Sequence, residues 1–224
     1  MLSNNCETPL SFYEEEIKSS ERFIFNYYRH LKTNTMKNII TLVAVLLLSV
    51  SSFAQTQWKV DPNHSSLNFN IEHSGISMVN GKFMDYTGSL TTNGDALTDA
   101  NFDFTVKIES INTNVDKRDN HLKSADFFEV EKYPEMTFKS NKILATGKPD
   151  KYLLYGELTI KGVTKDVIFD VHYGGTIKND QGEKLGLKAE TTINRFDYNV
   201  DYDPTGAAVG KEVNIVAHLQ FAKQ

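Results

Sequence analysis

The stretch Val213-Asn214-Ile215-Val216-Ala217-His218-Leu219-Gln220-Phe221 carries an apolar side chain at every second position from 213 to 221. A period of two is typical of a β-strand that buries one face. The same period appears in three other clear runs and four weaker ones, at Leu67–His73, Phe102–Ile108, Val167–Tyr173, 81–91, 136–146, 152–161 and 185–193. The sequence therefore predicts an all-β domain of about eight strands.

Short turns separate these runs. They contain glycine, asparagine, aspartate or proline, at Asn93-Gly94-Asp95, Gly147-Lys148-Pro149-Asp150, Lys161-Gly162 and Asn179-Asp180-Gln181-Gly182. Such residues supply the positive or fixed φ that tight hairpins need, and short hairpins make neighbouring strands antiparallel. We predict a meander that closes into an antiparallel eight-stranded barrel, since closure removes exposed strand edges. A two-sheet sandwich is the alternative.

One polar segment interrupts the strands, from Asn112 to Pro134. Within it, Lys117 to Ser124 fits one or two helical turns, with Asp116 as the N-cap. We therefore expect one short helical excursion, at the place where a closed barrel would have its mouth or a lid.

The segment 36–54 has the anatomy of a secretory signal peptide. Lys37 is followed by an apolar run, and Ser52-Phe53-Ala54 offers small residues before Gln55. An uncleaved signal anchor is the alternative. We expect residues 1–35, which hold Cys6, to be a wrongly extended gene start. The remaining domain, 55–224, has no cysteine and therefore no disulfide framework.

Several classes of function find no support. The net charge of −5 comes without a basic stripe, which argues against nucleic-acid binding. The chain has no phosphate-binding loop, no nucleophile elbow and no metal-binding His/Cys motif. The histidines of the domain are dispersed, at positions 64, 73, 121, 172 and 218. We expect no catalytic residues, no metal site and no cofactor.

Two sets of residues are candidates for ligand binding. Arg118 and His121 stand three apart in the polar segment, where they would face the same way and suit an anionic head group. Alternatively, Arg118 pairs with Asp119 or Asp126 and only stiffens the loop. The second set is aromatic and either lines a cavity or fills a core: Phe69, Phe83, Phe104, Phe138, Tyr155 and Phe169. A one-residue error in register would turn any of these side chains outward.

The order of several short motifs resembles the YceI-like family of secreted bacterial proteins over about residues 57–222. The matching pieces are Trp58-Lys59-Val60-Asp61-Pro62-Asn63-His64-Ser65-Ser66-Leu67-Asn68-Phe69, Ile71 with His73, Gly81-Lys82-Phe83, Ser110-Ile111-Asn112-Thr113, Arg118-Asp119-Asn120-His121-Leu122, Asp126-Phe127-Phe128, Tyr133-Pro134, Phe138-Lys139-Ser140 and Gly156-Glu157-Leu158-Thr159-Ile160-Lys161-Gly162-Val163-Thr164. One departure is Arg195-Phe196-Asp197-Tyr198-Asn199, where relatives often end in glycine. Asparagine tolerates left-handed geometry, so we expect this turn to be kept.

The resemblance implies a lipocalin-like barrel that holds a long apolar molecule, a polyisoprenoid or a fatty-acid-like amphiphile, for transport, storage or sequestration. It implies no enzymatic activity and a periplasmic or secreted location. Two other functions stay open: a lipid-modifying enzyme that uses Arg118 and His121, and a structural barrel with a filled core. Whether the chain forms a homodimer also stays open.

Overall fold

The computed structural model describes residues 18–30, 32, 55–94 and 96–224. The chain divides into two compact units, Met1–Phe53 and Ala54–Gln224. In the first unit, residues 18–30 form a helix with exposed side chains. No helix in the described part of the chain is both long and apolar enough to span a bilayer. The expected signal peptide at 36–54 lies outside the described residues and stays a prediction. That residues 1–35 are a wrongly extended gene start also stays a prediction.

The second unit is built almost wholly from strands. Its described residues form β1 (Thr56–Val60), β2 (Ser66–His73), β3 (Ser77–Phe83), β4 (Tyr86–Thr92), β5 (Asn101–Lys107), β6 (Ile111–Asn112), β7 (Glu135–Ala145), β8 (Lys151–Ile160), β9 (Val163–Asn179), β10 (Gly182–Asn194) and β11 (Val209–Lys223). The helical elements are short: η1 (Pro62–His64), η2 (Leu97–Asp99), η3 (Ile108–Ser110), α2 (Asp116–Lys123) and η4 (Arg195–Tyr198).

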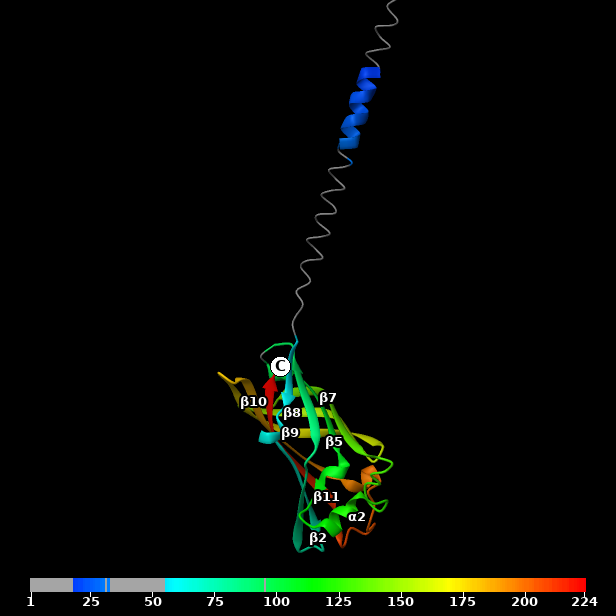
Figure 1. Cartoon of the computed structure of the whole chain (residues 1–224), viewed down its shortest axis with the longest axis vertical. Coiled ribbons are helices and arrows are strands. Elements are labelled where there is room, and N and C mark those ends of the chain that lie inside the picture. Colours follow the sequence, from blue (N-terminus) through cyan, green and yellow to red (C-terminus); the bar gives the residue numbers. More distant parts are fainter. Residues whose placement is uncertain (1–17, 31, 33–54, 95) are drawn as a thin grey trace, which may run out of the picture. The chain divides into compact units, whose positions relative to one another are not determined.

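The strands close into a ring (Figure 1). The hydrogen-bonded order is β1-β4-β5-β7-β8-β9-β10-β11, and β1 pairs with β11 to complete the circle. Beyond η1, β11 continues its pairing with β2, and β2 pairs in turn with β3 and β3 with β6. Every pairing is antiparallel. The predicted eight-stranded antiparallel barrel is therefore confirmed, and the sandwich alternative is wrong.

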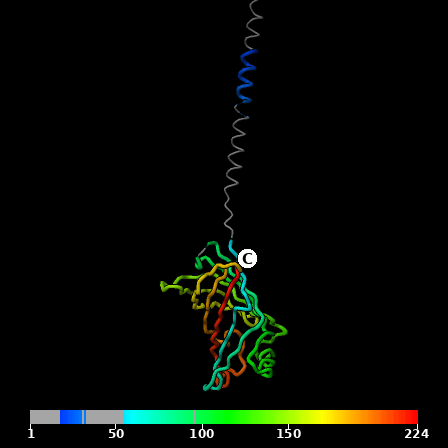
Figure 2. Tube along the Cα trace, turned by 60° about the vertical axis from the view of Figure 1, so that its left-hand side comes forward, coloured from blue at the N-terminus to red at the C-terminus, as the bar shows by residue number. Residues whose placement is uncertain are grey.

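The opening stretch shows why the barrel forms. In β11 the side chains of Ala217, Leu219 and Phe221 are buried, whereas His218 between them is exposed. The neighbouring strand β10 places Ala189 opposite Ala217 in the same register. Alternation thus gives each strand an inner apolar face and an outer polar face. Figure 2 shows the strands following one another around the barrel.

Turn residues occupy the conformations that the sequence predicts. Lys161 and Gly162 have φ values of 48° and 74° and join β8 directly to β9. Asn199 has φ 56° and ψ 30° and ends η4 in the left-handed region. The expectation that asparagine keeps this turn is confirmed.

The helical excursion differs in one detail from its prediction. The helix α2 begins at Asp116 and follows Val115, which is the N-cap and makes no side-chain capping bond. Asp119 in the first turn is buried and accepts hydrogen bonds from the backbone N–H and the hydroxyl of Thr113. The assignment of Asp116 as N-cap was wrong, because the acceptor that orders this helix start lies three residues further on.

Candidate functional site: an apolar cavity inside the barrel

The barrel encloses a cavity of ≈ 190 Å³. Thirty residues line it, and all but Asn68, Thr137 and Arg195 are apolar or aromatic. The others are Leu67, Phe69, Ile71, Phe83, Tyr86, Phe102, Phe104, Val106, Leu122, Phe127, Phe128, Met136, Phe138, Leu154, Leu158, Ile160, Phe169, Leu187, Ala189, Ile193, Tyr198, Val200, Val209, Val213, Ile215, Ala217 and Leu219. Such a wall binds by excluding water from apolar surface, with little directional chemistry.

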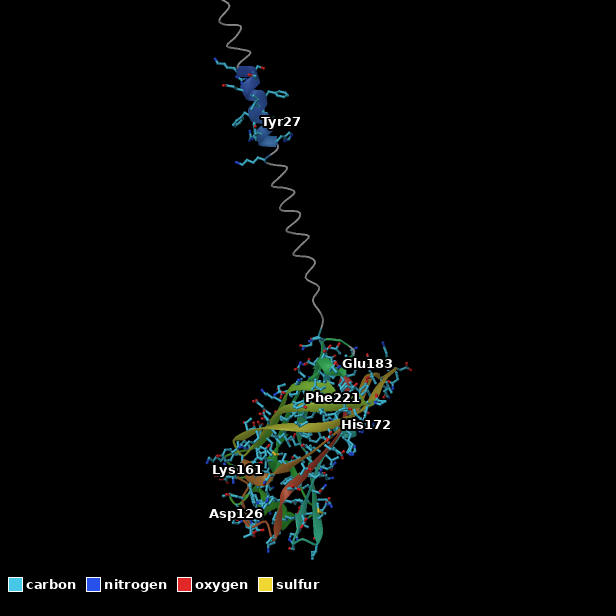
Figure 3. All side chains as sticks on the ribbon, turned by 180° about the vertical axis from the view of Figure 1, so that it is seen from behind. Tyr27, Asp126, Lys161, His172, Glu183 and Phe221 are labelled. Atoms are coloured by element: carbon cyan, nitrogen blue, oxygen red, sulfur yellow. The ribbon has the colours of Figure 1, made fainter. Side chains whose placement is uncertain are left out.

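The cavity lies toward one end of the barrel. Side chains that are buried but do not line it fill the other end: Trp58, Leu90, Ile143, Val171 and Leu185. Along β10 the wall runs from Leu187 to Ile193, toward η4, and along β11 it reaches Val209. Asp126, beside α2, and Glu183, at the start of β10, lie at opposite ends in Figure 3. The open volume is therefore at the end that carries α2 and η4.

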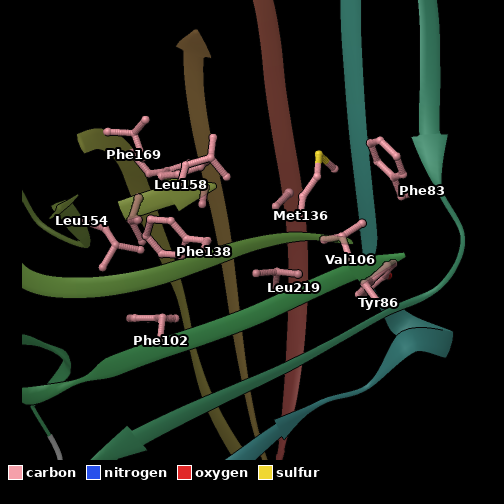
Figure 4. Packing of buried hydrophobic residues seen from close by; sticks show 14 of the residues in the cluster. Phe83, Tyr86, Phe102, Val106, Met136, Phe138, Leu154, Leu158, Phe169 and Leu219 are labelled. Atoms are coloured by element: carbon pink, nitrogen blue, oxygen red, sulfur yellow. The ribbon is translucent and has the colours of Figure 1, made fainter. Parts of the chain in front are cut away.

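Five of the six predicted aromatic residues line this cavity: Phe69, Phe83, Phe104, Phe138 and Phe169. The rings of Phe138 and Phe169 meet edge to face with centroids 5.1 Å apart, and those of Phe69 and Phe83 lie 5.7 Å apart. Figure 4 shows Phe138 and Phe169 with Leu154 and Leu158 in one cluster. That these residues contact a ligand stays a prediction.

Tyr155 does not line the cavity. Leu154 and Leu158 do, and alternation along β8 sends Tyr155, which is an odd number of residues from each, to the opposite face. Its cross-strand partner on β9 is Ile168, which is itself exposed. Placing Tyr155 in the wall was wrong by one residue of register.

The polar segment contributes wall residues that the sequence reasoning missed. Leu122 at the end of α2 and the adjacent Phe127 and Phe128 line the cavity. The Phe128 ring meets Phe83 of β3 edge to face, with centroids 6.4 Å apart. The sequence signal for these wall residues is the adjacent pair Phe127 and Phe128 inside an otherwise polar segment. The segment therefore covers the cavity end with an apolar underside.

Arg118 and His121 are outside the cavity wall, and a different residue holds each of them. Arg118 donates from Nε to the Thr113 hydroxyl at 2.7 Å and from Nη2 to the Thr113 carbonyl at 2.8 Å. His121 Nε2 lies 2.9 Å from Oδ2 of Asp126. Arg118 thus stiffens the segment through a threonine rather than through either carboxylate. A role for the pair in head-group binding stays a prediction.

A second covering element is the loop 199–208, and Arg195 organises it. This guanidinium is 3% exposed and donates to four backbone carbonyls, those of Gly210, Val200, Asp203 and Val209, at 2.6–3.1 Å. Burial lowers the pKa of Arg195 from its ordinary value, and nearby Asp203 and Asp201 oppose that change. No spacing or periodicity in the sequence indicates this role, because the partners are main-chain atoms.

The titratable groups of the wall are poorly suited to acid–base chemistry near neutral pH. They are Arg195, Tyr86 and Tyr198. Burial raises the pKa of Tyr198 to about 12, and it also raises that of Tyr86. Proton transfer at neutral pH needs a group whose pKa lies near 7. The geometry is that of a container for an apolar chain.

Comparison with known proteins agrees with this geometry. The model of the YceI-like domain matches residues 58–221. The UPF0312 protein plu2095 of Photorhabdus laumondii is 37% identical over 171 residues, which are 75% of this chain and 88% of that protein. The chain belongs to the YceI-like family. Protein YceI of Escherichia coli is 33% identical and is covered to 94%, against 81% of this chain.

Solved YceI-like structures share the barrel. The YceI protein of Campylobacter jejuni superimposes with a TM-score of 0.62 at 34% identity, covering 68% of this chain and 89% of that one. BcnA of Burkholderia cenocepacia gives 0.66 at 22% identity, over 72% and 98% of the two chains. A domain from Saccharophagus degradans described as polyisoprenoid-binding gives 0.60 at 16% identity, over 75% and 98%. The last two likenesses concern the fold alone.

Proposed function

We propose that this chain is an exported binding protein that holds one long apolar molecule, a polyisoprenoid or a fatty-acid-like amphiphile, inside its barrel for transport, storage or sequestration. The observation that carries the proposal is the cavity of ≈ 190 Å³ with an almost wholly apolar wall, filled at one end and covered at the other by α2 and the loop 199–208. A barrel with a completely filled core would leave no such volume.

Burial of the chain is sufficient for affinity. Each buried CH₂ contributes about 0.8 kcal/mol, so one isoprene unit contributes roughly 3 kcal/mol before the cost of ordering the ligand. The wall offers contacts to rings and branched aliphatic side chains along its length and few polar ones. The tail therefore sets the strength of binding, and a head group sets its orientation.

The enzyme alternative draws no support from the site. Its two residues, Arg118 and His121, are held by Thr113 and Asp126 outside the wall. A reacting group of a buried ligand would meet Tyr86, Tyr198 or Arg195. Burial raises the pKa of both tyrosines from an ordinary value that is already above neutral, and Arg195 donates to four backbone carbonyls. A binding role is the function that the geometry supports best.

Export is part of the proposal and rests on the sequence of 36–54. An intact-mass measurement on protein from the periplasm or medium of the host tests it. The expected product begins at Gln55. A chain that retains residues 36–54, or that is confined to the cytosol, overturns the export proposal without touching ligand binding.

Native mass spectrometry of protein purified from its host, followed by organic extraction, tests the binding role. The expected result is one equivalent of a long-chain lipid.

A useful variant is Ala217→Phe, which places a ring in the cavity, with Ala145→Phe at an exposed strand position as its control. Lipid retained by the control and lost by Ala217→Phe supports the proposal. Wild-type protein without extractable lipid contradicts it.

A further inference from the structure

Three phenylalanine rings of the cavity wall lie directly over glycines of a neighbouring strand. Phe69 on β2 stands opposite Gly81 on β3, and Phe104 on β5 stands opposite Gly88 on β4. A Cβ added at Gly81 would be 2.2 Å from Cζ of Phe69, and one added at Gly88 would be 2.3 Å from Cε1 of Phe104. The third pair is diagonal, with Phe138 of β7 over Gly156 of β8 at 2.6 Å.

All three glycines belong to inward-facing positions. Gly81 precedes buried Phe83 by two residues, and Gly88 stands between buried Tyr86 and Leu90. An ordinary side chain there would point into the barrel, and the ring beside it would have to stand further from the wall. Ordinary contact begins at 3.4 Å, so an alanine at position 81 or 88 displaces its ring by about 1 Å or more. The missing Cβ atoms therefore let the rings lie against the wall.

The consequence concerns the width of the cavity. The rings of Phe69, Phe104 and Phe138 all line it, while the glycines beneath them do not. They come from three different strand pairs, so the effect is distributed around the barrel. A straight alkyl chain is slim, whereas an isoprenoid chain carries a methyl branch at every fourth main-chain carbon and needs a wider bore.

We propose that Gly81, Gly88 and Gly156 set the bore of the cavity and thereby select methyl-branched chains over straight alkyl chains. This inference rests on the proposed binding function and adds the residues that determine its specificity. It places the specificity in glycines that do not themselves line the cavity. The rings above them transmit the effect.

Gly81→Ala and Gly88→Ala test the inference, because the three atoms nearest to the added methyl group are ring atoms at each of these two positions. Gly186→Ala is the matched control, since a Cβ on that strand glycine meets nothing within 4 Å. The probes are geranylgeraniol and hexadecan-1-ol, two alcohols with main chains of equal length that differ in methyl branches and unsaturation. Each is titrated by displacement of a fluorescent fatty acid, and the ratio of the two Kd values is the readout.

Wild-type protein and Gly186→Ala are expected to prefer geranylgeraniol, and each bore variant is expected to shift the ratio by about tenfold toward hexadecan-1-ol. A ratio that stays at the wild-type value in folded Gly81→Ala and Gly88→Ala overturns the inference. Wild-type protein that binds neither alcohol nor the fluorescent probe overturns the binding function itself. The two failures are thus distinguishable.

A double variant distinguishes a change in cavity width from a folding defect. In Gly81→Ala/Phe69→Leu the smaller side chain leaves room for the new methyl group. If the bore is the cause, this variant regains the wild-type preference for the branched alcohol, and Phe69→Leu alone strengthens it. A double variant that melts cooperatively but keeps the ratio of Gly81→Ala contradicts the proposed mechanism.

Discussion

The rings of His121 and Tyr202 meet edge to face, with centroids 5.0 Å apart and planes at 84°. Phe127 joins them, 5.0 Å from His121 and 4.7 Å from Tyr202, and this same ring lines the cavity. The cluster therefore connects the two elements that cover the cavity end, α2 with its following segment and the loop 199–208. The position of His121 is thus accounted for by packing between these two elements.

Removing the Tyr202 ring is expected to loosen this cover. Tyr202→Ala should lower the free energy of unfolding by about 1 kcal/mol, the usual worth of an aromatic pair, and should speed release of a bound fatty-acid probe. Stopped-flow dilution measures the release rate. Tyr202→Phe keeps the ring and should release at the wild-type rate. Equal rates for wild type and Tyr202→Ala would show that the cluster does not control access.

Arg195→Met should destabilise the barrel strongly. The substitution keeps much of the side-chain length but leaves four backbone carbonyls without their buried donor. Hydrogen bonds to a charged group contribute about 1.5–3 kcal/mol each, so a loss of at least about 3 kcal/mol is expected in urea denaturation. Lys165→Met, at an exposed position of β9, serves as control and should change little. A loss below about 1 kcal/mol would contradict the organising role of Arg195.

Acid should weaken the loop 199–208 through Asp203. The Thr205 hydroxyl and then the backbone N–H of Val209 hold the pKa of Asp203 at about 2, below its ordinary value of 3.8. Because the folded-state pKa is depressed, this stabilisation is present above about pH 4 and is lost as the pH falls through about 2. Urea midpoints measured between pH 5 and pH 2 should therefore fall more steeply for wild type than for Asp203→Asn. Parallel curves would contradict this assignment.

Gly156→Ala should cost more stability than Gly81→Ala. Its added Cβ would be 2.5 Å from the carbonyl oxygen of Lys139, a backbone atom that cannot swing aside as a ring can. Overpacking of this kind costs about 1–3 kcal/mol. Thermal denaturation of the two variants beside Gly186→Ala provides the comparison. A Gly156→Ala protein as stable as the Gly186→Ala control would show that the strand relaxes locally.

The barrel was predictable because its information is local and repeated. Alternation such as that of Ala217, Leu219 and Phe221 marks a buried face, and turn residues such as Lys161-Gly162 mark where the chain reverses. Closure followed from the need to pair strand edges. The predicted five phenylalanines reached the cavity wall for the same reason, whereas Tyr155 did not, because one residue of register reverses the face.

The covering elements were less predictable because their contacts are distant in sequence or involve main-chain atoms. Arg195 binds carbonyls of residues up to 15 positions away, and Tyr202 meets a ring 81 positions before it. Nothing periodic connects such partners. The contacts between glycines and phenylalanines could not be predicted for a related reason. Only the register between two strands brings Gly81 under Phe69.

The most direct test of the account is where a bound chain lies. An isotope-edited NOESY spectrum of ¹³C-labelled protein with unlabelled geranylgeraniol reports which side chains are within a few ångströms of the ligand. The account predicts cross-peaks from the ligand methyl groups to the rings of Phe69, Phe138 and Phe169, and none to outward-facing Tyr155. Cross-peaks to Tyr155 and Ile168 without any to those three rings would contradict it.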